Sequence, residues 1–202
     1  MKILALIGGS GSGKSTVLNG LKAHFGTRAS ILSLDNYYKP KYELPVDENG
    51  ETNFDLPEVI DEVAMVADID QLLSGRSISL QTYTYNREVM ESKEIVIEPS
   101  EWLIVEGLFA MAYPAMIDRV DLLGYIDAPP EVRLQRRIDR DGNERGYTEE
   151  EVRYQWKNHV RPADIQFIEP WKLRADVVID NQHDWKDGLE SLIAKMESLN
   201  TK

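Results

Sequence analysis

The sequence contains no cysteine, so the fold has no disulfide bond and no thiolate metal site. It also lacks an apolar run of the roughly 20 residues that a membrane-spanning helix needs. No signal peptide precedes the first apolar segment, residues 2–7, which leads directly into a glycine-rich loop. We therefore expect a cytoplasmic protein with no membrane partner.

Positive charge is also scarce, since 23 Lys and Arg stand against 35 Asp and Glu and the net charge is −12. A chain with this balance is poorly suited to bind nucleic acid. Residues 133–174 are an exception, because they hold ten of the 23 basic residues and only eight acidic ones. This locally positive segment indicates either a binding site for a small polyanion or a solvated helix of mixed charge.

Alternating short apolar segments and longer amphipathic segments predict an α/β fold with a five-stranded, mostly parallel sheet flanked by helices. No repeat or linker interrupts the chain, so we expect one domain over residues 1–202. We predict strands at residues 2–7, 31–34, 102–105, 122–126 and 177–179, and helices at 14–25, 57–73, 132–140, 149–159 and 185–199. A β-hairpin insertion is predicted at about 77–98, with its strands at 78–85 and 94–97.

The glycine-rich loop after the first predicted strand satisfies the pattern G-x-x-x-x-G-K-[ST]. Its glycines let backbone N–H groups point at phosphate oxygens, and the start of the next helix adds a positive dipole end. Lys14 would reach the β- and γ-phosphates of ATP, and Ser15 would hold Mg²⁺. The pattern predicts a P-loop NTPase fold with these nucleotide-binding residues: Gly8, Gly9, Ser10, Gly11, Ser12, Gly13, Lys14, Ser15 and Thr16.

Carboxylates follow two other predicted strands. Asp35 comes directly after residues 31–34, and Glu106 comes directly after residues 102–105. Ligands of parallel α/β sheets bind beyond the carboxyl ends of the strands, so both side chains are expected near the phosphates. Phosphoryl transfer needs a group that accepts the proton of the attacking hydroxyl and acids that hold Mg²⁺. Asp35 is the candidate base, and Glu106 is the candidate metal-associated acid.

Several further motifs follow the P-loop in order along the chain. They are Leu34-Asp35-Asn36-Tyr37-Tyr38, Asn53-Phe54-Asp55-Leu56-Pro57, Val105-Glu106-Gly107, Arg136-Arg137-Ile138-Asp139-Arg140-Asp141, Glu144-Arg145-Gly146, Tyr154-Gln155 and Arg174-Ala175-Asp176-Val177-Val178-Ile179. Together with the P-loop they resemble the uridine–cytidine kinase family, within the wider group that holds phosphoribulokinase and bacterial pantothenate kinase. The resemblance covers nearly the whole chain.

The resemblance implies roles for individual residues. Asp35 corresponds to the base that activates the acceptor hydroxyl, and Ser15 and Glu106 correspond to Mg²⁺-associated groups. Arg140 and Arg145 match residues of a helical lid, here about 131–148, that neutralise phosphate charge together with Lys14. The residues that match acceptor contacts are Tyr38, Asp55, Arg137 and Gln155.

The hairpin departs from the nucleoside kinases, where a histidine after a Tyr-Asp-Phe-type element reads the pyrimidine edge. Here the segment is Tyr83-Thr84-Tyr85-Asn86-Arg87, without a histidine. Tyr83 and Tyr85 share one side of the hairpin and either stack on the acceptor or belong to the core. We interpret the three histidines, His24, His159 and His183, as structural residues.

The sequence thus predicts an ATP-dependent kinase whose acceptor is the 5′-hydroxyl of uridine or cytidine. A kinase for another polyol, sugar or pantothenate-like metabolite is the alternative, because the hairpin histidine is missing. A nucleotide-dependent regulatory protein with little activity is the second alternative. The expected partners are ATP and a small acceptor molecule, and the family often assembles through its hairpin region, which leaves a homo-oligomer open.

Overall fold

The computed structural model describes residues 1–83, 93–182 and 184–200. Its central sheet is entirely parallel and has the strand order β2-β5-β1-β6-β7. This confirms the predicted five-stranded sheet flanked by helices. The five strands are β1 (Lys2–Ile7), β2 (Ala29–Ser33), β5 (Trp102–Glu106), β6 (Leu122–Asp127) and β7 (Val177–Asp180).

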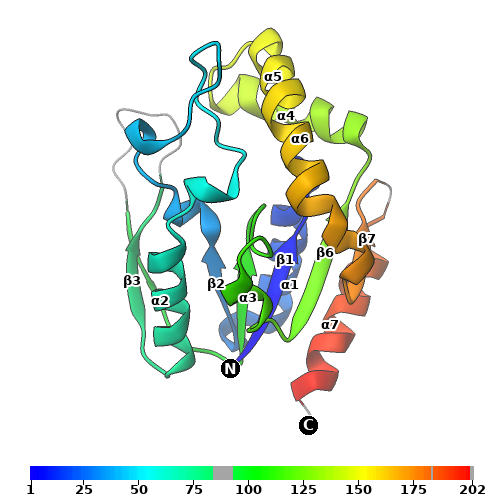
Figure 1. Ribbon diagram of the computed structural model, residues 1–202. Coiled ribbons are helices and arrows are strands. Elements are labelled where there is room, and N and C mark those ends of the chain that lie inside the picture. Colours follow the sequence, from blue (N-terminus) through cyan, green and yellow to red (C-terminus); the bar gives the residue numbers. More distant parts are fainter. Residues whose placement is uncertain (84–92, 183, 201–202) are drawn as a thin grey trace.

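Helices cover both faces of the sheet, and a long helical segment crosses above its upper end (Figure 1). The helices are α1 (Lys14–Phe25), α2 (Glu62–Leu73), α3 (Pro114–Ile117), α4 (Pro130–Glu144), α5 (Glu149–Gln155), α6 (Arg161–Ala163) and α7 (Lys186–Asn200). Two π-helical segments, Trp156–Val160 and Asp164–Ile168, continue α5 and α6. No helix among the described residues has the length and apolar content needed to cross a membrane.

Two further strands, β3 (Ile78–Gln81) and β4 (Glu94–Ile97), pair antiparallel in a separate sheet. They lie beside α2 in Figure 1. The hairpin predicted at about 77–98 therefore forms, although its first strand ends at Gln81 instead of continuing to Tyr85. Tyr85 itself lies outside the described residues.

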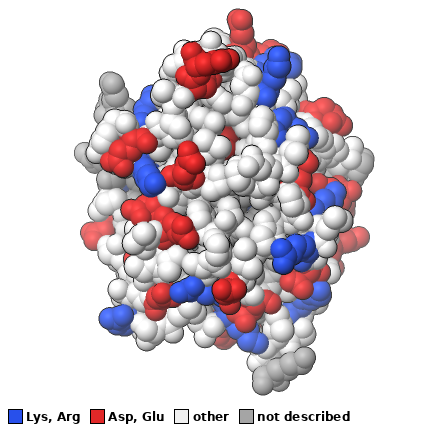
Figure 2. Space-filling model, in the orientation of Figure 1, with Lys and Arg blue, Asp and Glu red and all other residues white. Residues whose placement is uncertain are grey.

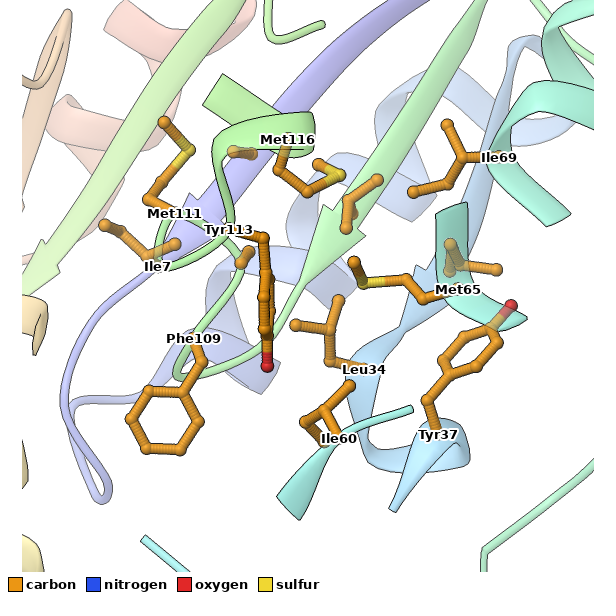
Figure 3. Packing of buried hydrophobic residues seen from close by; sticks show 14 of the residues in the cluster. Ile7, Leu34, Tyr37, Ile60, Met65, Ile69, Phe109, Met111, Tyr113 and Met116 are labelled. Carbon is orange, nitrogen blue, oxygen red and sulfur yellow. The ribbon is translucent and has the colours of Figure 1, made fainter. Parts of the chain in front are cut away.

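The core has two parts because alternate residues of each central strand face opposite sides of the sheet. In β1, Ile3, Ala5 and Ile7 belong to one buried cluster, whereas Leu4 and Leu6 belong to the other. Figure 3 shows the first cluster. Its tyrosines are not purely apolar contacts, since the hydroxyl of Tyr37 donates to Asp68 Oδ2 at 2.8 Å and that of Tyr113 donates to the Pro57 carbonyl at 2.7 Å.

Several predicted boundaries are wrong. Strand β2 spans Ala29–Ser33, so Leu34 begins a 3₁₀ turn and Asp35 lies in that turn, not directly after the strand. Glu106 is the last residue of β5, not the residue after it. These two shifts leave both carboxylates at the carboxyl edge of the sheet, because Ser33 and Glu106 are register partners in the β2–β5 pair.

The helix predicted at 57–73 is interrupted. Pro57–Val59 forms a 3₁₀ turn, and α2 begins only at Glu62. The interruption has a local cause, since the N–H of Asp61 donates to the Tyr37 carbonyl at 2.8 Å while its side chain caps α2 by accepting from the N–H of Ala64. The helix predicted at 132–140 is longer than expected and spans Pro130–Glu144, with its proline in the first turn.

Candidate active site

The loop between β1 and α1 has the conformation that a phosphate-binding loop requires. Gly11 and Gly13 have φ values of 77° and 98°, in the left-handed region that favours glycine. A Cβ at Gly13 would also overlap the side-chain amide of Asn181. Lys14, the first residue of α1, donates from Nζ to the Gly8 carbonyl at 2.8 Å and so lies folded over the loop.

Helix α4 and the residue after β7 hold this loop in place. Arg137 donates from Nη1 to Ser10 Oγ at 3.0 Å, and Asn181 donates from Nδ2 to the Ser12 carbonyl at 2.6 Å. Arg136 links α4 to the residue after β7, since its Nη2 donates to the Asn181 carbonyl at 2.8 Å. The loop is therefore supported from the C-terminal half of the chain.

A cleft of about 300 Å³ opens in front of the loop. It brings together most of the site residues that we predicted from the sequence. Those lining the cleft are Ser10, Gly11, Gly13, Lys14, Ser15, Asp35, Tyr38, Asp55, Glu106, Arg137, Arg140, Arg145 and Gln155. Among the predicted site residues that the structure describes, Gly8, Gly9, Ser12, Thr16 and Tyr83 are not part of this lining.

Three ionisable groups meet at the phosphate end of the cleft. Asp35 is exposed to solvent at the mouth of the cleft, but the protein around it partly desolvates the carboxylate and raises its pKa, against the opposing positive charges of Lys14, Arg145 and Arg140. Burial and then the charge of Asp35 raise the pKa of Glu106, which also accepts a hydrogen bond from Ser33 Oγ at 2.5 Å. Burial lowers the pKa of Lys14, while Glu106 and Asp35 oppose that shift. The lysine and the two carboxylates thus share one electrostatic environment.

The other end of the cleft is built by the loop after β2. Asp55 is 8% exposed, and burial raises its pKa while the charge of Arg137 acts in the opposite direction. Tyr38 packs edge-on against Phe54, with 6.0 Å between ring centroids, and lies 5.1 Å from the ring centroid of Tyr83. Tyr83 is therefore adjacent to a lining residue although it does not line the cleft itself.

Seven lining residues were not among those predicted from the sequence: Thr52, Phe54, Gly107, Leu108, Arg136, Tyr147 and His159. Arg136, Phe54 and Gly107 lie within the motifs that carried the family resemblance, so the motifs gave a signal for them. His159 had no such signal, and we interpreted it as structural. Its Nε2 lies 2.9 Å from Asp47 Oδ2, a contact between residues 112 positions apart in the sequence. His24 differs, since it pairs with Glu197 at 3.2 Å and lies outside this lining.

The cleft collects positive charge in an acidic protein. Five cationic side chains line it against the three carboxylates of Asp35, Asp55 and Glu106; the cations are Lys14, Arg136, Arg137, Arg140 and Arg145. On the outer face shown in Figure 2, acidic and basic side chains are interspersed. The concentration of cations around a P-loop is the arrangement that stabilises the phosphates of a nucleotide.

The fold and this cleft define a P-loop kinase, and comparisons with known proteins identify its family. The model of the Phosphoribulokinase / Uridine kinase family matches residues 3–186. The chain belongs to this family and is an ATP-dependent kinase. It is 36% identical over 201 residues to the uridine kinase of Staphylococcus epidermidis, covering 99% of this chain and 97% of the relative. It is 36% identical over 176 residues to the uridine kinase of Halobacterium salinarum, covering 87% of this chain and 78% of the relative.

Solved structures agree on the fold. A possible uridine kinase from Bacillus stearothermophilus superposes with a TM-score of 0.60 at 21% identity, covering 88% of this chain and 87% of that chain. Phosphoribulokinase from Rhodobacter spheroides superposes with a TM-score of 0.63 at 18% identity, covering 89% of this chain and 69% of that chain.

Proposed function

We propose that this kinase transfers the γ-phosphoryl group of ATP to the 5′-hydroxyl of a pyrimidine nucleoside, uridine or cytidine. The observation that carries the proposal is the cleft itself, in which two carboxylates, the solvent-accessible Asp35 and the buried Asp55, line one cavity together with the P-loop. The similarity to relatives named uridine kinase supports the nucleoside as acceptor.

In the proposed reaction, the P-loop residues from Gly8 to Thr16 bind the phosphates of ATP through their backbone N–H groups. Asp35 accepts the proton of the acceptor hydroxyl, whose oxygen then forms a bond to the γ-phosphorus as the bond to the β,γ-bridging oxygen breaks. A raised pKa makes Asp35 a stronger base than a fully solvated aspartate. Lys14, Arg140 and Arg145 stabilise the charge on the transferred group.

For the acceptor, we propose contacts from Tyr38, Asp55, Arg137, Gln155, Tyr83 and Tyr85. A buried carboxylate such as Asp55 is suited to accept hydrogen bonds from two neighbouring hydroxyls of a sugar. Arg137 donates to Gln155 Oε1 at 3.4 Å, so these two side chains form one polar surface in the lining of the cleft. Of this set, Tyr85 is the residue that lies outside the described part of the chain.

The donor set at the P-loop also fits Mg²⁺. Among the described residues no group of three or more His, Cys, Asp or Glu side chains could hold a metal. Mg²⁺ at nucleotide sites, however, uses one or two carboxylates together with phosphate oxygens and water. Ser15 and Glu106 would hold the ion, and burial together with the charge of Asp35 raises the pKa of Glu106. When bound, the ion neutralises charge on the β- and γ-phosphates.

A kinase for another polyol, sugar or pantothenate-like acceptor is the second candidate. The specific observation in its favour is the segment Tyr83-Thr84-Tyr85-Asn86-Arg87, which lacks the base-reading histidine of the nucleoside kinases that the chain resembles. The proposed base, P-loop and arginines would serve such an acceptor equally well, so only the acceptor contacts separate the two candidates.

The test is an ADP-release assay with Mg-ATP and a panel of acceptors: uridine, cytidine, purine nucleosides, ribulose 5-phosphate, pantothenate and glycerate. We expect the highest kcat/KM with uridine or cytidine, and loss of this turnover in an Asp35→Asn variant that still binds ATP. Turnover with another panel member but with neither pyrimidine nucleoside would replace the first candidate by the second.

A further inference from the structure

The side chain of His159 has no part in the reaction proposed above. His159 lies in the π-helical segment Trp156–Val160, and its side chain is only 3% exposed. It nevertheless lines the cleft, as Asp55 and Gln155 also do. Asp55 interacts electrostatically with this residue, so the imidazole lies near that carboxylate. A buried imidazole in this position is a polar group available to the acceptor half of the site.

The carboxylate of Asp47 fixes the orientation of this imidazole. Asp47 Oδ2 lies 2.9 Å from His159 Nε2 and accepts a hydrogen bond from the Tyr154 hydroxyl at 2.6 Å. Asp47 Oδ1 accepts from the backbone N–H groups of Asn49 and Glu51, both at 2.9 Å. The carboxylate therefore has partners on both oxygens and ties the loop after β2 to the segment after α5, which meet above the sheet in Figure 1.

This arrangement determines which ring nitrogen carries the proton. The hydrogen bond from Tyr154, followed by those from the backbone and His159, holds the pKa of Asp47 below its usual range. Asp47 is then an ionised acceptor with no proton to donate. His159 Nε2 must supply the hydrogen of the contact, so the neutral imidazole has Nε2–H and leaves Nδ1 as a hydrogen-bond acceptor.

The second nitrogen is unsatisfied within the protein. His159 Nδ1 has no hydrogen-bond partner among the residues that the structure describes. Nor is it among the fully buried side-chain atoms that lack a partner, and the residue that carries it lines the cleft. An oriented, desolvated acceptor atom in a binding cleft is a recognition group, because leaving it unpaired is unfavourable.

We propose that His159 is a specificity-determining residue whose Nδ1 accepts a hydrogen bond from an O–H or N–H group of the phosphoryl acceptor. The inference rests on the proposed function in so far as the cleft takes a hydroxyl-bearing acceptor. A pyrimidine nucleoside offers such donors on its base, at N3 of uridine or the amino group of cytidine, and on its ribose. Sites with a buried hydrogen-bonding group reject analogues that lack the matching group.

Nuclear magnetic resonance of the imidazole nitrogens tests which ring nitrogen of His159 carries the proton, and it requires no acceptor. The chain has only three histidines, so a His159→Gln variant assigns the signals of His159 by their disappearance. We expect a protonated Nε2 and an unprotonated Nδ1 at pH 7.5. A proton on Nδ1 at this pH would overturn the proposal, because that nitrogen could then only donate.

Kinetics of two matched variants test whether Nδ1 of His159 binds the phosphoryl acceptor. In His159→Gln the side-chain Nε2 takes the place of the histidine Nε2 and keeps the contact to Asp47, while the Nδ1 position loses its nitrogen. In His159→Asn the amide takes the place of Nδ1 and the contact to Asp47 is lost. We expect His159→Gln to raise the KM for uridine about tenfold or more, with the KM for ATP within about twofold of the wild type. The wild type should likewise discriminate against 3-methyluridine or 2′-deoxyuridine, whichever lacks the donor that His159 reads.

Three further outcomes separate the possibilities. An unchanged KM for the acceptor in His159→Gln overturns the proposal, and so does a rise in both KM values together with a lower Tm, which indicates a purely structural role. A smaller effect in His159→Asn than in His159→Gln supports it. If the wild type phosphorylates neither uridine nor cytidine, the proposed function fails instead. The KM comparison then applies to the acceptor that the wild type does use, and with no acceptor at all the tautomer measurement alone decides.

Discussion

The carboxylate of Asp141 is fully buried and lies 2.7 Å from Nε of Arg140, the residue before it in helix α4. The same carboxylate lies 3.3 Å from Nη2 of Arg137 and 3.4 Å from Nη1 of Arg145. A single buried acid therefore organises three of the arginines that line the cleft. Because a buried carboxylate is costly unless it is paired, the three cations also stabilise Asp141.

Asp141→Asn should destabilise the protein and weaken catalysis together. The substitution removes one partner of a buried ionic cluster and leaves the buried Arg137 without its counter-charge, a change that costs about 3–5 kcal/mol. Urea denaturation measures the free energy of unfolding. Asp139→Asn, at an exposed position on the same helix, is the matched control and should change it by less than about 0.5 kcal/mol. Equal stability of the two variants would contradict this role of Asp141.

Arg140→Ala should slow phosphoryl transfer with little loss of stability. Arg140 is 34% exposed, and after its removal Asp141 still has Arg137 and Arg145 as partners. Loss of one charge-stabilising group lowers kcat about 10²–10³-fold. Steady-state kinetics and thermal unfolding measure the two effects. Arg153→Ala removes an exposed ion pair to Glu149 on α5 and should leave both unchanged. A fall in Tm proportionate to the fall in kcat would argue for a structural role of Arg140.

The sequence predicted those features of the site that are encoded by short contiguous patterns. The P-loop needs only the glycines and Lys14 between a strand and a helix. The positions of Asp35 and Glu106 followed from the rule that ligands bind at the carboxyl ends of parallel strands. Strand β2 begins two residues earlier and ends one residue earlier than predicted, but Asp35 still lies at the carboxyl edge of the sheet. Local patterns thus located the phosphate end of the cleft.

Contacts between distant segments could not be predicted in this way. Asp47 and His159 are 112 positions apart, and nothing in either neighbourhood indicates that they meet. The break before α2 was missed for a similar reason, since it depends on the hydrogen bond from the N–H of Asp61 to the Tyr37 carbonyl. Helical periodicity alone favoured continuing the helix from Pro57. Tertiary hydrogen bonds overrode that local preference.

Asp35→Asn should abolish most turnover while leaving ATP binding intact. The asparagine keeps the shape of the side chain but cannot accept the proton of the acceptor hydroxyl. General-base catalysis contributes about 10²–10⁴-fold, so kcat should fall by that factor. Stabilisation of the protein by Mg-ATP, measured as a rise in Tm, should persist in the variant. Full activity of Asp35→Asn would remove Asp35 from the mechanism.

The raised pKa of Asp35 has opposite consequences for activity and stability. The base must be ionised, so the acidic limb of the kcat profile should lie above the ordinary value of 3.8. For stability the sign is reversed, because the folded state binds the proton more tightly than the unfolded state. Stability therefore falls as the pH rises from the ordinary pKa of 3.8 to the higher pKa of the folded state. Asp35→Asn removes a partly desolvated charge at a solvent-accessible position and should therefore raise the Tm slightly at pH 7. This gain should shrink as the pH approaches 3.8, and a lower Tm of the variant at pH 7 would contradict the assignment.

Gly9→Ala should displace the P-loop, because Gly9 packs against side chains of the protein interior. Gly9 packs directly on the guanidinium of Arg133, and a Cβ at this position would overlap that group and lie 2.8 Å from Asp164 Oδ1. Arg133 and Asp164 form a buried ion pair, with side chains 5% and 1% exposed, so neither can move into solvent. Overpacking of this kind costs about 1–3 kcal/mol and displaces the loop that binds phosphate.

The measurements for Gly9→Ala are the free energy of unfolding and the KM for ATP, and we expect the first to fall and the second to rise. Gly142→Ala provides the matched control, because the nearest atom to its Cβ is the Tyr147 carbonyl oxygen at 3.6 Å, an ordinary contact. Since Gly142 lies inside α4, alanine should stabilise the helix by up to about 1 kcal/mol. A Gly9→Ala variant with unchanged stability and ATP affinity would show that Arg133 and Asp164 can move aside, and that the P-loop does not depend on their packing.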